Sequence, residues 1–289
     1  MVVQVRDNIA YVIDTEDDNP GGLMLIDGST PESPSLLGSY VNEGMPNDFV
    51  LQGDLAFVAN RFDGLEILNI SDPQNITRIG HYHLGYEVSD VQIQDNFAYL
   101  GGMDQGFEIV NITDPTNPQK ISNTVLTGDC INVCLQDDLL YVTDHIQYTN
   151  IEVYNITNAN SPQKVGEFTL EDHDFFFPTI FGDFMYVADH GSTGDILILD
   201  ISDPTNIIEV GRVDPESSRS AYRMWVQDDI LYMTDYEKVL LLVDVSDPIN
   251  PVFITRYMDG GAGQDVTLDG GYIYFDASHG GLQILQYTP

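Results

Sequence analysis

Histidines beside carboxylates are the residues of this chain best suited to chemistry. A neutral imidazole transfers protons or binds a transition metal, and a neighbouring carboxylate orients the ring. Asp144-His145 and Asp189-His190 each follow a strand-like apolar segment, and His173 precedes the second pair. No metal-ligand spacing and no nucleophile elbow surrounds these residues. Two interpretations therefore stay open, namely a metal or acid–base site and a set of polar loop residues.

A second candidate site consists of residues that stand just before seven short apolar segments. Three carboxylates, an amide and an arginine are among them, and such groups would hold a cation or water if they met around one axis. The alternative is that each aspartate accepts hydrogen bonds from backbone amides of its own loop. The seven positions are Val2, Asp48, Asp90, Asn132, Phe177, Arg223 and Asp265.

Calcium is the one cofactor that the acidic groups suit, because it takes six to eight oxygen ligands. The first candidate site is the loop containing Asp14, Glu16 and Asp18. The second is the set Asp48, Asp90 and Asp265. The calcium-loop pattern D-x-[DN]-x-[DN]-G is not met, so a solvated turn is the alternative for the first loop.

Two further motifs have a functional and a structural interpretation. His81 and His83 are two residues apart on a strand-like segment, so they face one side and suit zinc, or they are two polar positions on a surface strand. Phe175, Phe176 and Phe177 cannot all point inward from one strand. At least one should be exposed or pack on a neighbouring loop, as a contact for a partner or as filling between repeats.

The elements that position these residues form a repeat. An aromatic residue recurs in a strand-like segment at intervals of 42 to 46 residues. Eight residues before six of these aromatic residues, an apolar residue opens an alternating segment, and Pro178 takes that place in the fifth repeat. The aromatic positions are Tyr11, Phe57, Tyr99, Tyr141, Tyr186, Tyr232 and Tyr274.

Each repeat contains four short strand-like segments separated by turn signals, and no segment has a helical apolar period. Seven four-stranded antiparallel units of this length predict an all-β, seven-bladed β-propeller that forms a single domain. The apolar first and second strands should lie inside, with the more polar fourth strand outside. The expected blades span roughly 1–42, 43–84, 85–126, 127–170, 171–216, 217–259 and 260–289.

The third strand and the turn after it carry a family resemblance. Residues 64–73 are GLEILNISDP, residues 196–204 are ILILDISDP and residues 241–248 are LLVDVSDP. These units resemble the LVIVD-repeat family of β-propellers, over essentially the whole chain. The resemblance implies the propeller fold and an exported or surface-associated protein, and it implies no particular reaction.

The last repeat differs from the others because the sequence ends after its third strand-like segment, Gly281 to Tyr287. We therefore expect three strands in blade seven, or completion of the blade by residues from outside this chain. An open strand edge is a site for β-augmentation by a partner strand.

The charge balance limits the partners. Forty-six acidic residues against ten basic ones give a net charge of −36, which repels nucleic acids and anionic lipids and attracts cations. No apolar segment reaches transmembrane length, so direct membrane insertion is not expected. Sequons at Asn69, Asn75, Asn111 and Asn155 are compatible with an extracellular or cell-surface protein whose export signal lies outside this chain.

These observations favour a non-enzymatic binding or assembly module that contacts a protein partner, or a second copy of itself. The contact would use either the channel-mouth face, formed by the residues before the first strands, or the open edge of blade seven. Within that face the candidate binding residues also include His173, Asp189 and His190. The alternative is a metal-assisted hydrolase or lactonase-like enzyme with its site at the channel mouth, an analogy from the fold alone.

Overall fold

The computed structural model describes residues 2–14, 21–42, 44–126, 128–145, 150–171, 173, 175–189, 195–214, 221–235, 239–258, 265–276 and 281–286. These ranges contain strands and turns and no helix. No helix within them could therefore span a membrane.

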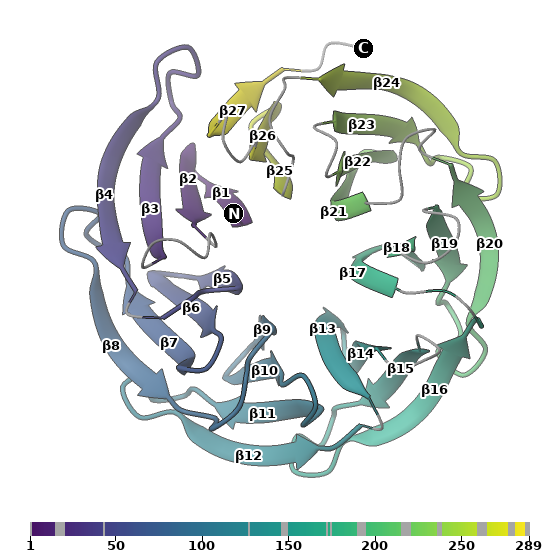
Figure 1. Cartoon of the computed structure of the whole chain (residues 1–289), viewed down its shortest axis with the longest axis horizontal. Helices are drawn as coiled ribbons and strands as arrows, with labels where there is room; N and C mark the ends of the chain where they lie inside the picture. Colours follow the sequence, from purple (N-terminus) through teal and green to yellow (C-terminus); the bar gives the residue numbers. More distant parts are fainter. Residues whose placement is uncertain are drawn as a thin grey trace. The chain divides into compact units, whose positions relative to one another are not determined.

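Seven antiparallel sheets follow one another along the chain, and the protein is an all-β, seven-bladed β-propeller (Figure 1). Six sheets contain four strands that pair in chain order, and the last sheet contains three. Blade one is β1 (Val2–Arg6), β2 (Ile9–Ile13), β3 (Gly22–Asp27) and β4 (Ser35–Val41). Blade two is β5 (Asp48–Gln52), β6 (Leu55–Asn60), β7 (Gly64–Asn69) and β8 (Thr77–Tyr82). Blade three is β9 (Asp90–Gln94), β10 (Phe97–Gly101), β11 (Phe107–Asn111) and β12 (Gln119–Thr124).

The later blades repeat this order. Blade four is β13 (Asp129–Gln136), β14 (Leu139–His145), β15 (Asn150–Asn155) and β16 (Gln163–Thr169). Blade five is β17 (Phe175–Phe181), β18 (Phe184–Asp189), β19 (Ile196–Asp200) and β20 (Ile208–Val213). Blade six is β21 (Ala221–Gln227), β22 (Ile230–Asp235), β23 (Val239–Asp244) and β24 (Val252–Met258). Blade seven is β25 (Asp265–Asp269), β26 (Tyr272–Asp276) and β27 (Leu282–Leu285).

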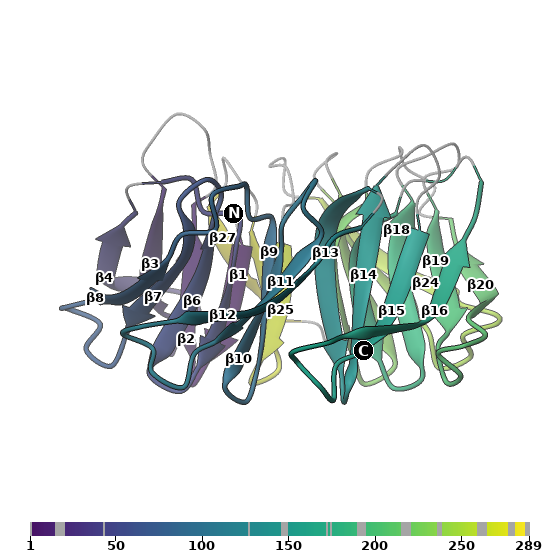
Figure 2. The same ribbon diagram turned by 90° about the horizontal axis from the view of Figure 1, so that it is seen from below.

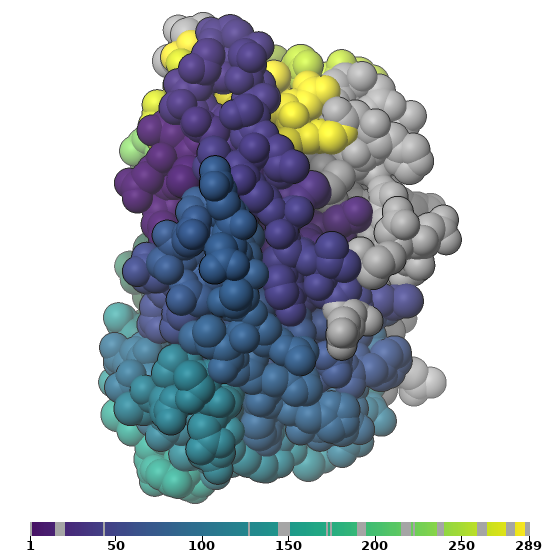
Figure 3. All heavy atoms as spheres, turned by 90° about the vertical axis from the view of Figure 1, so that its left-hand side faces the viewer, coloured from purple at the N-terminus to yellow at the C-terminus, as the bar shows by residue number. Residues whose placement is uncertain are grey.

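The chain divides into two compact units. The first contains Met1–Asp144 and Asn155–Gln163, and the second contains His145–Tyr154 and Lys164–Pro289. Within the first unit the first strands β1, β5 and β9 lie inside and the fourth strands β4, β8 and β12 lie outside (Figure 1). Figure 2 shows these blades from the side, and Figure 3 shows the outer surface of blade one in purple and blade two in blue. That the chain forms one domain stays a prediction.

The first and second strands of every blade are joined by two residues, and positive φ angles explain which residues stand there. Asp7 and Asn8 have φ of 55° and 61°, and Asp228 and Asp229 have φ of 51° and 59°. Two positive φ values define the type I′ turn, whose twist matches the flanking strands, and Asn, Asp and Gly tolerate it best. The Asp-, Asn- and Gly-rich dipeptides thus set the strand register.

The turn after the third strand is fixed by side-chain caps. The Asn69 Oδ1 atom accepts a hydrogen bond from the amide of Ser71 (2.9 Å), and Asp200 Oδ1 accepts one from the amide of Ser202 (2.9 Å). Asn111 and Asn155 cap their turns in the same way. Three of the four sequons therefore coincide with residues that the turn needs.

The aromatic repeat positions form part of the core. Each of the seven side chains is at most 6% exposed, and the neighbouring second-strand residues are buried with them. Separate apolar clusters fill the spaces between successive blades, such as Phe49, Val58 and Leu68 between blades one and two. Apolar burial between blades is therefore the main stabilising contribution.

A glycine in the fourth strand allows the next blade to pack closely. A Cβ atom at Gly80 would overlap the carbonyl oxygen of Pro115, the proline of the next blade's turn. Ser122 takes this position in β12, and its hydroxyl donates to the carbonyl oxygen of Ala159 (2.6 Å) where the other turns have proline. Three further glycines approach the proline carbonyl oxygen of the next blade's turn as Gly80 does, namely Gly38 to Pro73, Gly166 to Pro204 and Gly211 to Pro248.

Blade seven has three strands, as the sequence predicts. Among the described residues, β27 pairs with β26 and forms the outer edge of the sheet. The described part of blade seven has no fourth strand, and so no turn leading into one that could cover β24. Thr255 takes the glycine position in β24 and is exposed.

Candidate functional site

The seven positions of the expected channel mouth are divided between the two units, so they are described unit by unit. Val2, Asp48 and Asp90 are the first residues of β1, β5 and β9, whereas Asn132 lies inside β13. These four strands contact one another in succession. All four side chains are buried, with 3–6% of their surface exposed.

Asp90 connects two neighbouring blades. Its Oδ1 atom accepts a hydrogen bond from the amide of Val91 (2.8 Å), and its Oδ2 atom accepts one from the amide of Val133 in blade four (2.8 Å). The Asn132 side-chain amide also donates to Asp90 Oδ2 (3.4 Å). The carboxylate therefore satisfies buried backbone donors, which is the structural role expected for these aspartates.

Asp265 repeats part of this arrangement in the second unit. It opens β25, is 7% exposed, and accepts a hydrogen bond from the amide of Val266 at 2.8 Å. A calcium site formed by Asp48, Asp90 and Asp265 would need carboxylate oxygens beyond those engaged with amides. Calcium binding at this set stays a prediction.

Phe177 and Arg223 occupy matching bulges in neighbouring strands. The register shifts between Phe176 and Thr179 in β17 and between Ala221 and Met224 in β21. Phe177 has a φ of 49°, uncommon for a residue with a bulky side chain, and the Arg223 guanidinium carbon lies 4.9 Å above its ring centroid. These two residues therefore lie inside their strands, and not just before them as the sequence suggested.

The three phenylalanines have different environments. Phe175 is fully buried and stacks with Phe168 of β16, with ring centroids 6.1 Å apart. Phe176 and Phe177 are partly buried, and Phe177 packs beneath Arg223. Phe175 and Phe177 thus pack on the neighbouring strands β16 and β21 and not on a loop, and none of the three rings is exposed.

His173 and Asp189 form a buried pair in blade five. The His173 Nδ1 atom lies 2.7 Å from Asp189 Oδ2, and the two side chains are 13% and 0% exposed. Asp189 ends β18, and the His173 ring stacks on Phe175 with centroids 6.1 Å apart. A carboxylate at Nδ1 fixes the orientation of the imidazole ring.

Some sequence-predicted positions lie outside the described residues. These are Glu16, Asp18 and His190, so the calcium loop is represented only by Asp14, which is partly buried. His145 lies at the end of β14. The Asp189-His190 pair is therefore described only through Asp189.

Three buried glutamates were missed by sequence reasoning. Glu66, Glu108 and Glu152 occupy the same place in the third strands of blades two, three and four and are at most 8% exposed. The Tyr82 and Tyr86 hydroxyls both donate to Glu108, and burial together with these bonds raises both tyrosine pKa values. An arginine or lysine stands twelve residues after each glutamate, and this repeated spacing is the sequence signal that could have revealed the pairs.

An exposed apolar surface on β24 was missed as well. Its members are more than one third exposed and lie on or next to this fourth strand, beside the three-stranded blade. The Tyr257 hydroxyl donates to Gln283 Oε1 of β27 at 3.2 Å. We call the two members that face blade seven the β24 patch: Val252 and Tyr257, which pair with Asp244 and Leu240.

The fold and the repeated turns define a seven-bladed propeller built from LVIVD-type units. The family model described as LVIVD repeat matches residues 1–42, 43–83, 85–125, 179–215 and 218–259, which is more than half of the chain. The protein belongs to the LVIVD repeat family. No curated protein matches it in sequence.

Solved structures share the fold at low sequence identity. The computationally designed Ika8 protein superposes with a TM-score of 0.70 at 12% identity, over 99% of this chain and 82% of the other. BamB from Moraxella catarrhalis superposes with a TM-score of 0.66 at 12% identity, over 99% of this chain and 84% of the other. These similarities concern the fold alone.

Proposed function

We propose that this protein is a non-enzymatic binding or assembly module of an exported or cell-surface protein. It binds an extended segment of a partner protein at the edge of blade seven. The observation that carries this proposal is the exposed β24 patch beside a blade of three strands. Each earlier fourth strand has the next blade's turn against it, whereas β24 has an exposed threonine at that position.

The edge of β27 supplies the directional part of this binding. A strand added there would hydrogen-bond to the outward backbone groups of Leu282 to Leu285. The Gln283 side chain, which accepts a hydrogen bond from Tyr257, lies between this edge and the β24 patch. A partner strand would therefore meet backbone groups and apolar side chains together.

The β24 patch supplies the apolar part. Val252 and Tyr257 are 60% and 39% exposed and face blade seven. In the other blades the corresponding surface meets a turn that ends a third strand and opens a fourth. The partner that fits is thus a segment containing a tight turn followed by a strand with alternating apolar residues.

The net charge of −36 favours a neutral or basic partner segment. It also opposes self-association at low salt, so sizing at several salt concentrations separates the two cases. The same charge argues against nucleic acid as a partner. The proposal requires no cofactor, and calcium binding is tested separately by the change in Tm when Ca²⁺ is added.

The test uses a surrogate for a turn and a fourth strand added to the three described strands of blade seven. A fluorescent peptide with the neutral sequence of residues 71–82, the turn and fourth strand of blade two, is titrated with the protein and its anisotropy is followed. We expect saturable binding and slower hydrogen exchange at Leu282 to Leu285. Replacing Val252→Glu and Tyr257→Glu together should weaken binding at least about tenfold, because two buried apolar contacts are lost.

A matched control carries Phe62→Glu and Val125→Glu, which are 66% and 70% exposed in the first unit. This variant should bind the peptide like the natural protein. Equal binding by the natural protein and both variants, or no binding by any of them, would contradict the proposal.

The alternative function, a metal-assisted hydrolase or lactonase-like enzyme, is favoured by the His173–Asp189 pair. In this case a chromogenic ester or a lactone should be hydrolysed at a rate that His173→Gln abolishes. The patch variant would then hydrolyse it as fast as the natural protein does. A rate that is the same in His173→Gln and in the natural protein would exclude a role for this pair.

A further inference from the structure

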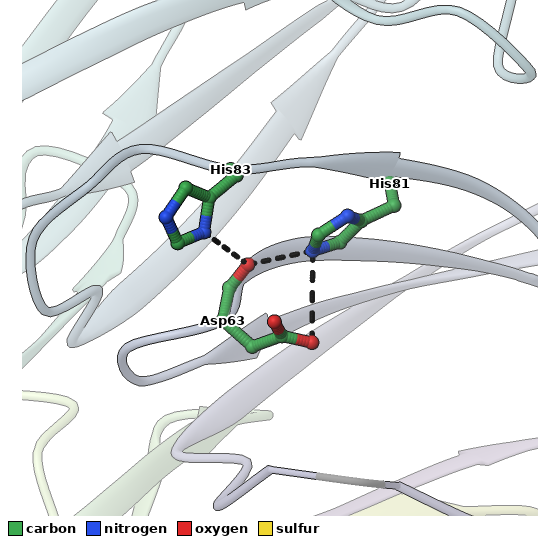
Figure 4. Close-up of side chains that lie close together, drawn as sticks. All are labelled: Asp63, His81 and His83. Atoms are coloured by element: carbon green, nitrogen blue, oxygen red, sulfur yellow. Dashed lines mark hydrogen bonds and ion pairs between the residues drawn. The ribbon is translucent and has the colours of Figure 1, made fainter.

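Three potential metal ligands meet on the outer side of blade two (Figure 4). Asp63 lies in the turn between β6 and β7, His81 lies in β8, and His83 follows the end of β8. One ligand atom from each side chain lies within 4.8 Å of the other two. His81 Nε2 is 3.6 Å from Asp63 Oδ2.

The backbone that carries these residues is held closely together. Gly64 has a φ of 96°, and a Cβ atom there would overlap the carbonyl oxygen of Tyr82. The turn therefore packs directly against the end of β8, where Leu65 pairs with Tyr82 and Glu66 pairs with His81. Preorganisation of the ligand backbones reduces the entropy lost on metal binding.

The distances fit a zinc ion after small side-chain movements. Zn–N and Zn–O bonds of about 2.0–2.2 Å in a tetrahedron place ligand atoms about 3.3–3.6 Å apart. The His81 Nε2 to Asp63 Oδ2 distance of 3.6 Å already falls at this spacing. His81 and His83 are exposed, so their rings can rotate toward a common ion.

Both histidines contact the backbone of the turn, because His83 Nδ1 also lies 3.4 Å from the carbonyl oxygen of Asp63 (Figure 4). The repeat needs only one such contact. His81 Nε2 lies 2.6 Å from the carbonyl oxygen of Asp63, and in blade three the Asn123 side chain donates to the carbonyl oxygen of Gln105 at 3.0 Å in the same place. The repeat thus uses a polar residue at this position to hold the turn. It requires neither the second histidine nor the carboxylate, because blade three has Val125 and Gln105 at those positions.

We propose that Asp63, His81 and His83 bind a zinc ion, or a similar transition metal, at the surface of blade two. His81 Nε2, His83 Nδ1 and an Asp63 carboxylate oxygen are the ligands, and water completes the coordination. Imidazole ligands select Zn²⁺ over Ca²⁺ and Mg²⁺, which prefer oxygen. The strongly negative surface raises the local concentration of cations at the site.

The test measures zinc affinity by competition with a chromophoric chelator, in the presence of millimolar Ca²⁺ that occupies ordinary carboxylate clusters. We expect one zinc ion per chain. His81→Ala and His83→Ala should each weaken its binding at least about tenfold, because loss even of an outer-shell partner costs about 10–100-fold. Asp63→Asn should weaken binding as well.

Two controls separate the metal site from the structural hydrogen bond. Asn123→Ala removes the equivalent turn bond in blade three and should leave zinc affinity unchanged. The combined change Gln105→Asp, Asn123→His and Val125→His copies the ligands into blade three and should add a second zinc ion. Zinc binding that is unaffected by His81→Ala and His83→Ala, or its absence from the natural protein, would overturn the proposal.

Discussion

Arg78 Nη1 lies 2.9 Å from Glu66 Oε1, and the glutamate side chain is fully buried while the arginine is 39% exposed. Lys120 and Glu108 (2.5 Å) and Lys164 and Glu152 (2.8 Å) repeat this pair in blades three and four. The Asn42 side-chain amide also donates to Glu66. A buried carboxylate is thus neutralised from the fourth strand of its own blade.

Replacing Arg78→Ala should destabilise the protein by about 2–3 kcal/mol, below the roughly 3–5 kcal/mol of a fully buried pair because the arginine is partly solvated. The double change Glu66→Met and Arg78→Leu gives blade two the residue types of blade one, which has Met24 and Leu36 at the equivalent positions. It should recover only part of the loss, because the buried Asn42 amide loses its acceptor, as judged by urea unfolding midpoints. A double variant less stable than Arg78→Ala would contradict this account.

Replacing Gly80→Ala should cost about 2–3 kcal/mol, because the added Cβ overlaps the Pro115 carbonyl oxygen and the blades must separate. Thr255→Ala, at the equivalent exposed position of β24, is the matched control and should change stability little. Thermal unfolding of the two variants is compared. Equal stability losses would show that this junction does not depend on the glycine.

Replacing Asp90→Ala should cost about 2–3 kcal/mol, because the amides of Val91 and Val133 lose their acceptor in a buried position. Asp90→Asn keeps one carbonyl acceptor and should cost less. The measurement is hydrogen exchange at Val91 and Val133, combined with urea unfolding. If calcium raises the Tm of the natural protein and of Asp90→Ala equally, Asp90 is not a calcium ligand.

Tyr141→Phe should be neutral or stabilise by up to about 1 kcal/mol, since the buried hydroxyl has no hydrogen-bond partner among the described residues. Burial, with smaller effects of Cys134 and Asp137, raises the pKa of Tyr141 to about 12. The pKa of this tyrosine is therefore higher in the folded protein than in the unfolded one, where it is about 10. The stability that results is fully present below pH 10 and is lost as the pH rises to 12.

The advantage of Tyr141→Phe should therefore increase between pH 10 and pH 12, and denaturant midpoints at several pH values measure it. Phe57 occupies the same repeat position in blade two, which shows that the site accepts a phenylalanine. A pH-independent difference between the two proteins would contradict the assigned titration.

The fold was predictable because its determinants are local and repeated. The aromatic positions and the Ser-Asp-Pro turns each recur at similar spacing, and each occupies the expected place. The three strands of blade seven followed from the same count. Repetition supplies several independent observations of each element, as an alignment otherwise would.

The candidate site was less predictable, because it depends on where repeats depart from their common pattern. The bulges that place Phe177 and Arg223 inside their strands have no signal in the apolar alternation. The His173–Asp189 pair joins residues sixteen positions apart through a loop conformation. Asp63 was not associated with His81 and His83, since only the packing of Gly64 on β8 brings it there.

The fourth-strand residue also limits how such a chain can gain or lose repeats. Ser122 of blade three packs on the turn of blade four, which has Ala159 where other turns have proline. At the other junctions described, a glycine of the fourth strand packs on a turn that contains proline. Deleting blade four would set the Ser122 side chain against Pro204 of blade five. Duplication or loss of a blade is therefore tolerated only when the fourth strand of one blade and the turn of the next change together.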